Sequence, residues 1–483
     1  MFWHSGWSLR NLEGVGATGP YFFTHISPLL YIPDALSYIL PFGRETWFSL
    51  VMALMHGGLA ALAFILIRPC MSRFKTGQGP VALLITLALA VLFGLNGIIL
   101  RSLWIGHFEF IIPILLITLF MALAAGRKTL AIVNFVLLCA AREDGGLHGA
   151  LFLAAYIAFE VFSSRKPLRD FRLEIAFILI GSAYSLFCIF YLMPILAGDD
   201  TIASSLYFGH PPFGHVTAMF MAGRAKDYLV ENTHLYLPLI LISAFAIFTR
   251  RWIYFAAILA VLPWSLVHFL AVNPDTGMMY SYKAFPFLVV FLWPFLAERL
   301  AAKTSSRICP SGKLPALLFV VVLSGMFAFR PDGSVHFAFD EKPAYSLLWP
   351  ETAMRAGFED FRAALLARHG DLGHAVAAPG AARLHPGLFR DNDVLVWYFP
   401  KLLTPRQDID TIIYQTGGRS RQMAESWARA NGHDHLYRVR GTSFRITANR
   451  DLTALDKLGP LLLPLPISRL KNQAPDQEPL PNG

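Results

Sequence analysis

Long apolar runs separated by short charged loops fill residues 46 to 329 of the chain. Backbone groups in hydrocarbon must be hydrogen-bonded within their own segment, and a core about 30 Å thick takes roughly 20 helical residues to cross. The 483 residues are 55% hydrophobic and 15% charged, and the mean hydropathy is +0.49, a composition rare among soluble domains. We therefore expect an all-α polytopic membrane domain with about ten transmembrane helices. The expected spans are 46–67, 79–100, 108–125, 129–142, 146–163, 173–196, 234–249, 252–272, 284–298 and 314–329.

Basic residues are unequally divided between the two sets of loops that these spans create. One set holds fifteen, namely Arg68, Arg73, Lys75, Arg127, Lys128, Arg165, Lys166, Arg169, Arg172, Arg250, Arg251, Arg299, Lys303, Arg307 and Lys313. The other set holds five, namely Arg101, Arg142, Arg224, Lys226 and Lys283. Because Lys and Arg collect in cytoplasmic loops, the first set is assigned to the cytoplasm. The formal net charge of +9 is thus a topology signal, and no nucleic-acid partner is expected.

This topology places residues 1–45 and everything after 329 on the outer face. Residues 1–45 lack a basic stretch followed by an apolar one, so they hold no signal peptide, and a further segment is expected upstream. Residues 330–459 alternate helical patterns with strand-like runs such as DTIIYQ and LYRVRGTSFRIT, which predicts a small extracytoplasmic α/β domain. Residues 460–483 are rich in proline and polar side chains and are expected to be disordered.

A charged triplet, Arg142, Glu143 and Asp144, interrupts the apolar sequence between the expected helices 129–142 and 146–163. One interpretation is a solvated turn in which the acidic side chains pair with the arginine. The other is a hairpin too short to reach the surface, whose charged turn faces a protein-lined, watered cavity because such charges are costly in lipid. The sequence leaves both interpretations open.

Other polar residues fall on the same predicted side of the membrane. The loop RSLWIGHFEF contributes Arg101, His107 and Glu109, MMYSYKAFPF contributes Tyr282 and Lys283, and YFFTHISPLL contributes His25. Glu109 and the two acidic residues of the triplet are the candidate catalytic carboxylates. The other named residues and Arg142 are candidate substrate-binding groups.

Carboxylates near cations at a membrane face suit chemistry on a lipid-linked phosphate. Arginine and lysine can hold the phosphate leaving group, while a carboxylate takes the proton of the attacking hydroxyl. This scheme requires no cofactor and no metal, although an acidic pair can recruit a divalent ion. The histidines of HPPFGH and HDH lack further ligands at a recognised spacing, so no metal site is predicted.

Four motifs, THISP, GHFEF, AREDGGL and MYSYKAFPF, resemble a family of bacterial polytopic membrane proteins of unknown function. The resemblance covers nearly the whole chain, and AREDGGL is its most specific part. That family is grouped with the GT-C glycosyltransferases, so the resemblance implies a GT-C-like fold in the bacterial inner membrane and a polyprenyl-phosphate-linked sugar as donor.

The chain departs from the family pattern at two motifs and at its start. GHFEF lacks the proline that members carry between histidine and glutamate, and MYSYKAFPF has Ser281, Tyr282 and Lys283 where a histidine and small residues are common. Phe2, Trp3 and Gly6 match a portion that follows an acidic first outer loop in the family. The resemblance therefore implies that the chain begins just after that loop and lacks its acidic residue.

The sequence favours a GT-C-like glycosyltransferase over two other classes. A transporter or flippase would also need a membrane cavity of mixed charge, but the chain shows no repeated pair of broken helices. A noncatalytic glycan-binding membrane protein would use the outer α/β domain as its contact module.

Overall fold

The structure is a computed structural model that describes part of the chain. The described residues are 25–37, 39, 44–71, 79–96, 98–99, 108–197, 207–209, 211–273, 279, 281–302, 313–324, 327–329, 335–337, 352–377, 409–415, 424–425, 428–429 and 432–466. They belong to two compact units, a helical one spanning His25–Leu347 and a second that includes Leu348–Gly483.

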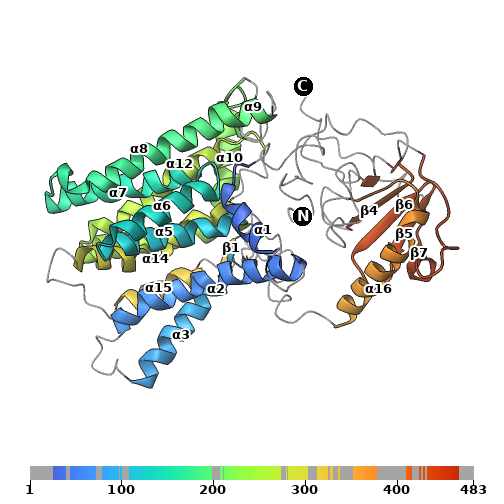
Figure 1. The fold of residues 1–483 in the computed structure, drawn as a ribbon, viewed down its shortest axis with the longest axis horizontal. Coiled ribbons are helices and arrows are strands. Elements are labelled where there is room, and N and C mark those ends of the chain that lie inside the picture. The colour runs from blue at the N-terminus through green and yellow to red at the C-terminus, as the bar shows by residue number, and fades with distance from the viewer. Residues whose placement is uncertain are drawn as a thin grey trace. The chain divides into compact units, whose positions relative to one another are not determined.

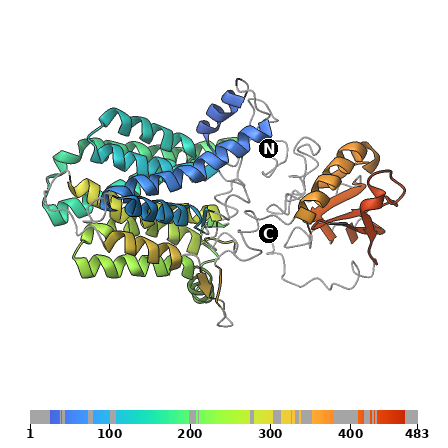
Figure 2. The same ribbon diagram turned by 90° about the horizontal axis from the view of Figure 1, so that it is seen from below.

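The helical unit consists of helices that run side by side (Figures 1 and 2). Its long helices are α2 (Arg44–Met71), α3 (Pro80–Gly94), α5 (Ile111–Ala124), α6 (Lys128–Ala141), α7 (Gly145–Ser164), α8 (Arg172–Phe187), α10 (Ala218–Glu231), α11 (Thr233–Thr249), α12 (Phe255–Phe269), α14 (Phe285–Ala302) and α15 (Lys313–Ser324). Its short elements are η4 (Pro28–Leu30), α1 (Tyr31–Ser37), η5 (Phe108–Phe110), η6 (Leu168–Phe171), η7 (Cys188–Leu192), α9 (Met193–Ala197), η9 (Trp252–Tyr254), η10 (Ser281–Ala284), β1 (Phe327–Phe329) and β2 (Val335–Phe337).

Each of the ten ranges expected to span a membrane holds a helix, but their lengths differ. Within the described residues, four segments are long and apolar enough to cross a membrane, namely Leu50–Met71, Gly145–Phe162, Leu168–Ile195 and Trp252–Phe269. The shorter apolar helices are Pro80–Gly94, Phe108–Ala124, Lys128–Ala141, His234–Thr249 and Lys313–Ser324. The described part of the protein is therefore mostly helical with four candidate membrane spans. The expectation of ten transmembrane helices stays a prediction.

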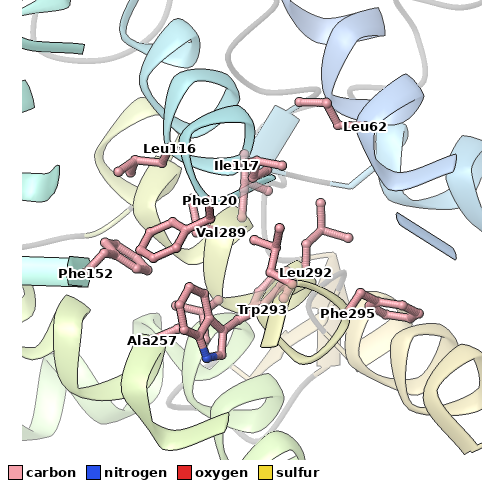
Figure 3. Packing of buried hydrophobic residues seen from close by; sticks show 14 of the residues in the cluster. Leu62, Leu116, Ile117, Phe120, Phe152, Ala257, Val289, Leu292, Trp293 and Phe295 are labelled. Carbon is pink, nitrogen blue, oxygen red and sulfur yellow. The ribbon is translucent and has the colours of Figure 1, made fainter. Parts of the chain in front are cut away.

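Helix α14 forms the centre of the unit. Its residues from Phe285 to Ala297 are buried on every side, as expected for a helix that is hydrophobic all round. The ring of Trp293 lies 4.9 Å from that of Phe120 and 6.2 Å from that of Phe152 (Figure 3). Its Nε1 donates to the carbonyl of Ile253 at 2.9 Å. These contacts join α14 to α5, α7 and the turn before α12.

The outer helices expose apolar side chains. The most apolar 18 residues within Leu168–Ile195 have a mean hydropathy of 2.2, yet only 22% of them are buried inside the protein. Exposed side chains along this segment include Leu179, Ile180 and Phe190. A water-soluble surface would hide such a band, whereas lipid solvates it.

The second unit contains a five-stranded sheet in the order β3-β4-β6-β5-β7. The strands are β3 (Ala375–Ala377), β4 (Thr411–Gln415), β5 (His435–Val439), β6 (Phe444–Ala448) and β7 (Leu462–Pro464), preceded by α16 (Thr352–Arg368). Strands β3 and β4 are parallel, and the other pairs are antiparallel. Phe361 of α16 packs on Phe444 of β6 with ring centroids 5.8 Å apart. The run LYRVRGTSFRIT forms two strands of a hairpin, β5 and β6, and not one strand. Gly441, whose φ is positive, lies in the turn between them.

Two predicted boundaries are corrected. The last apolar helix ends at Ser324 and not at 329, because Phe327–Phe329 pairs with Val335–Phe337 as a hairpin that contacts α10 and α11. The helical unit runs from His25 to Leu347, across the divisions that we expected at 45/46 and 329/330, and it includes the hairpin. The tail is ordered beyond 460, because β7 pairs with β5 through Val439 and Leu462. Residues 467–483 lie outside the described part.

Candidate functional site

The turn between α6 and α7 buries its three charged side chains. Arg142 is 4% exposed, and Glu143 and Asp144 are each 7% exposed. Arg142 leaves α6 in an extended conformation, and α7 begins at Gly145. A Cβ atom on Gly145 would collide with the carbonyl oxygen of Leu138, so only glycine fits this close return. The interpretation as a solvated turn is therefore wrong.

Arg142 is held by two carboxylates and two aromatic rings. Its Nε donates to Asp144 Oδ1 at 2.6 Å, its second terminal nitrogen donates to Asp144 Oδ2, and its first lies 3.4 Å from Glu109 Oε1. The guanidinium carbon lies 5.7 Å from the ring centroid of Trp264 and 5.4 Å from that of Phe285. All three guanidinium nitrogens thus face carboxylates, while aromatic faces add cation–π attraction.

Glu143 joins the turn to the N-terminal part of the helical unit. Its Oε1 lies 2.9 Å from Nδ1 of His25, and its Oε2 accepts from the backbone N–H of Ile26 at 2.9 Å. Burial by itself lowers the pKa of His25, but the charge and hydrogen bond of Glu143 outweigh it and raise that pKa above its usual value. The sequence placed both residues on one side of the membrane, and the structure brings them into contact.

Asp144 also faces the imidazole of His148, which the sequence patterns did not indicate as a site residue. His148 Nε2 lies 3.5 Å from Asp144 Oδ2, one helical turn along α7. The His148 ring lies 4.9 Å from that of Trp264 and 5.0 Å from that of Phe285. Its spacing of four residues from an aspartate at the helix start was the signal that could have revealed it.

Trp264 links Arg142 to the candidate residue Lys283. The indole Nε1 donates to the backbone carbonyl of Lys283 at 2.8 Å, and the same ring lies beside the guanidinium. The Lys283 side chain is half-buried in η10. Of the remaining candidates, Arg101, His107 and the side chain of Tyr282 lie outside the described part of the structure.

The cluster lies some way along the bundle from the start of the apolar segment of α2. That segment begins at Leu50, and His56 stacks on Phe110 with ring centroids 5.1 Å apart. Six residues of helix correspond to about 9 Å along the axis. Glu109, the neighbour of Phe110, is therefore recessed along the bundle and not at its tip.

The buried charges of the site are paired with one another. Burying an isolated charge is costly, and here each carboxylate has a cationic or imidazole partner. Among the described residues, no group of three or more His, Cys, Asp or Glu side chains is arranged to hold a metal ion. The half-buried His25 with its carboxylate partner can exchange a proton with a bound molecule.

Comparisons of the chain with protein-family models, with curated proteins and with solved structures find no match. The class of protein is therefore defined by fold and site alone. It is an apolar helical bundle with candidate membrane spans, a buried charged cluster, and a small C-terminal sheet unit.

Proposed function

We propose that the chain is a GT-C-like glycosyltransferase of the bacterial inner membrane, which takes its sugar from a polyprenyl-phosphate donor at the outer face. The single observation that carries this proposal is the burial of Glu109, Arg142, Glu143 and Asp144 together beside His25. Buried ionisable groups within membrane helices mark functional sites by default. The resemblance of the AREDGGL turn supports the same assignment.

The proposed reaction is a single inverting displacement. The acceptor hydroxyl oxygen attacks the anomeric carbon of the donor, and the bond from that carbon to the phosphate oxygen breaks. The bonding electron pair leaves with the polyprenyl phosphate. The proton of the acceptor hydroxyl passes to the His25–Glu143 pair, whose 2.9 Å contact orients the imidazole as a base.

Arg142 and Lys283 are the proposed partners of the donor phosphate. Arg142 is neutralised by Asp144 and Glu109 in the structure, so phosphate binding requires one of these contacts to be exchanged. The longer contact, 3.4 Å to Glu109, is the one that we expect to yield. Asp144 then keeps the guanidinium in place while it binds the leaving group.

Sugar transfer by the full chain in proteoliposomes tests this function. The substrates are a set of polyprenyl-phosphate hexoses, and the product is a covalent acceptor glycoside. Glu143→Gln should lower the transfer rate by about 10² to 10⁴. The matched control is Glu298→Gln, which removes a carboxylate 6% exposed that accepts from Tyr254 at 2.8 Å, about 20 Å away along α14 from Phe285.

Three results would contradict the proposal. Undiminished transfer by Glu143→Gln removes the assigned base. Movement of the lipid-linked sugar across the membrane without any covalent product makes the protein a transporter or flippase. Binding without transfer or movement makes it a glycan-binding protein.

The orientation belongs to the same proposal and has its own test. The proposed topology puts the end of α14, Ala302, in the cytoplasm and the end of α15, Ser324, outside with the C-terminal unit. Alkaline phosphatase needs disulfides and is active only outside the cytoplasm. Its fusion after Ser324 should be active and its fusion after Ala302 inactive, and the opposite pattern refutes the orientation.

A further inference from the structure

His56 is a buried polar side chain that the proposed reaction does not use. It is 6% exposed and lies on the inward face of α2 with Met52, Met55 and Leu59. A histidine on such an apolar face normally has partners for both ring nitrogens.

The first nitrogen fixes the tautomer of the ring. Nδ1 lies 2.6 Å from the backbone carbonyl oxygen of Met52. A carbonyl oxygen only accepts, so Nδ1 carries the hydrogen and donates it. In the neutral imidazole, Nε2 is then an acceptor with an available lone pair.

The second nitrogen has no hydrogen-bond partner among the residues that the structure describes, although it is buried. An orphaned acceptor of this kind points to a donor that completes it when bound. Hydrogen-bonding chemistry limits what this donor can be. An ionised phosphate oxygen has no hydrogen and its lone pair would repel that of Nε2, whereas a hydroxyl group can donate a hydrogen bond to Nε2.

The position of His56 ties this acceptor to the charged cluster. Its ring stacks on Phe110 at 5.1 Å with an angle of 21° between the planes. Phe110 follows Glu109, whose carboxylate lies 3.4 Å from Arg142. A molecule whose phosphate binds near Arg142 can therefore present a neighbouring polar group toward α2.

We propose that Nε2 of His56 accepts a hydrogen bond from a hydroxyl of the sugar carried by the lipid-linked donor. This inference rests on the proposed function and deepens it, because it adds a sugar-reading residue to a site otherwise made of charges. His56 would be a binding residue on α2, while the proton of the acceptor goes to the His25–Glu143 pair.

Binding measurements on the full chain in lipid nanodiscs test the inference. The probes are farnesyl phosphates carrying mannose, glucose or galactose, and farnesyl phosphate without sugar. His56→Phe keeps a ring to stack on Phe110 and removes the acceptor. It should weaken binding of the preferred glycosylated probe about tenfold and change that of the sugar-free probe less than twofold. His56→Gln, which restores an acceptor oxygen, should recover most of the lost affinity.

Each other outcome overturns the inference in a recognisable way. If wild type and His56→Phe bind the glycosylated probe with equal affinity, Nε2 of His56 accepts no hydrogen bond from the sugar and at most binds a water molecule. Equal weakening of both kinds of probe, with a lowered melting temperature, shows a structural role. If the wild type binds no glycosylated probe better than the sugar-free one, the protein does not read the donor sugar at all. If it binds neither kind, the proposed function fails as well.

Discussion

Gly146 of α7 and Gly181 of α8 face each other where the backbones of the two helices are in contact. A Cβ atom on Gly146 would lie 2.5 Å from the carbonyl oxygen of Gly181, and one on Gly181 would lie 2.6 Å from that of Gly146. Next to this crossing, the backbone N–H of Leu147 donates to the Ser185 hydroxyl at 2.9 Å. Small residues allow such backbone contact between membrane helices. The crossing fixes the start of α7, which directly follows Asp144.

Gly181→Ala should destabilise the helical unit, because the new methyl group has no room against the α7 backbone. The expected cost is about 1–3 kcal/mol, seen as a lower melting temperature in detergent. Gly57→Ala in α2 is the matched control, since a Cβ there meets nothing within 4 Å. The control should be neutral or slightly stabilising. Equal melting temperatures for the two variants would show that the helices can separate without cost.

Asp144→Asn should be strongly destabilising. Arg142 is only 4% exposed, and the substitution removes the carboxylate that binds its guanidinium in a bidentate manner. Removal of one partner from a buried pair costs about 3–5 kcal/mol. Asp170→Asn, at an exposed aspartate in the same unit, should stay within about 0.5 kcal/mol of wild type. Thermal unfolding of the three proteins in one detergent measures the difference. A cost for Asp144→Asn no larger than for Asp170→Asn would mean that the turn opens readily to water.

Apolar runs located the helices from sequence because a bilayer leaves the backbone no hydrogen-bond partners outside its own segment. The same argument gave burial of Arg142 as one of two interpretations, since the flanking runs are short, and it did not decide between them. It could not identify α14 as the central helix, because the other helices are also apolar and only packing distinguishes them. It also extended the last helix past Ser324, where the apolar residues Phe327–Phe329 continue as a strand.

The site was predictable in its charges but not in their pairing. The sequence shows Glu109, Glu143 and Arg142 directly, because they are charged residues among apolar ones. It does not single out Trp264 and His148, which resemble ordinary helix residues. Only the fold places Trp264 beside the guanidinium of Arg142 and His148 beside Asp144. The contact of His25 with Glu143 joins residues 118 positions apart. Such a pairing depends on tertiary packing, which local sequence patterns do not encode.

Stability should depend on pH through His25. Burial lowers the pKa of this imidazole, but the charge and hydrogen bond of Glu143 raise the pKa by more than burial lowers it. The pKa of His25 in the folded protein therefore lies above the usual 6.5. A group with a raised folded pKa stabilises the protein fully below its unfolded pKa and loses that effect as pH rises through the folded pKa. Wild type should therefore exceed His25→Asn in melting temperature by about 2 to 4 °C below pH 6.5, and the gap should shrink at higher pH. Parallel curves for the two proteins from pH 6 to 9 would contradict the ion pair.

The sheet unit offers a test that is independent of the membrane. Glu425, 2% exposed, accepts from Arg445 at 2.8 Å and from the Tyr414 hydroxyl at 3.1 Å, across paired strands β4 and β6. Arg445→Leu removes this guanidinium from a buried carboxylate and should destabilise the unit by about 3–5 kcal/mol. Hydrogen exchange on the full chain should show faster exchange along Thr411–Gln415. Arg438→Leu, an exposed arginine on the neighbouring strand β5, is the control and should leave that exchange unchanged. Equal protection in both variants would show that the Tyr414 hydroxyl alone satisfies Glu425.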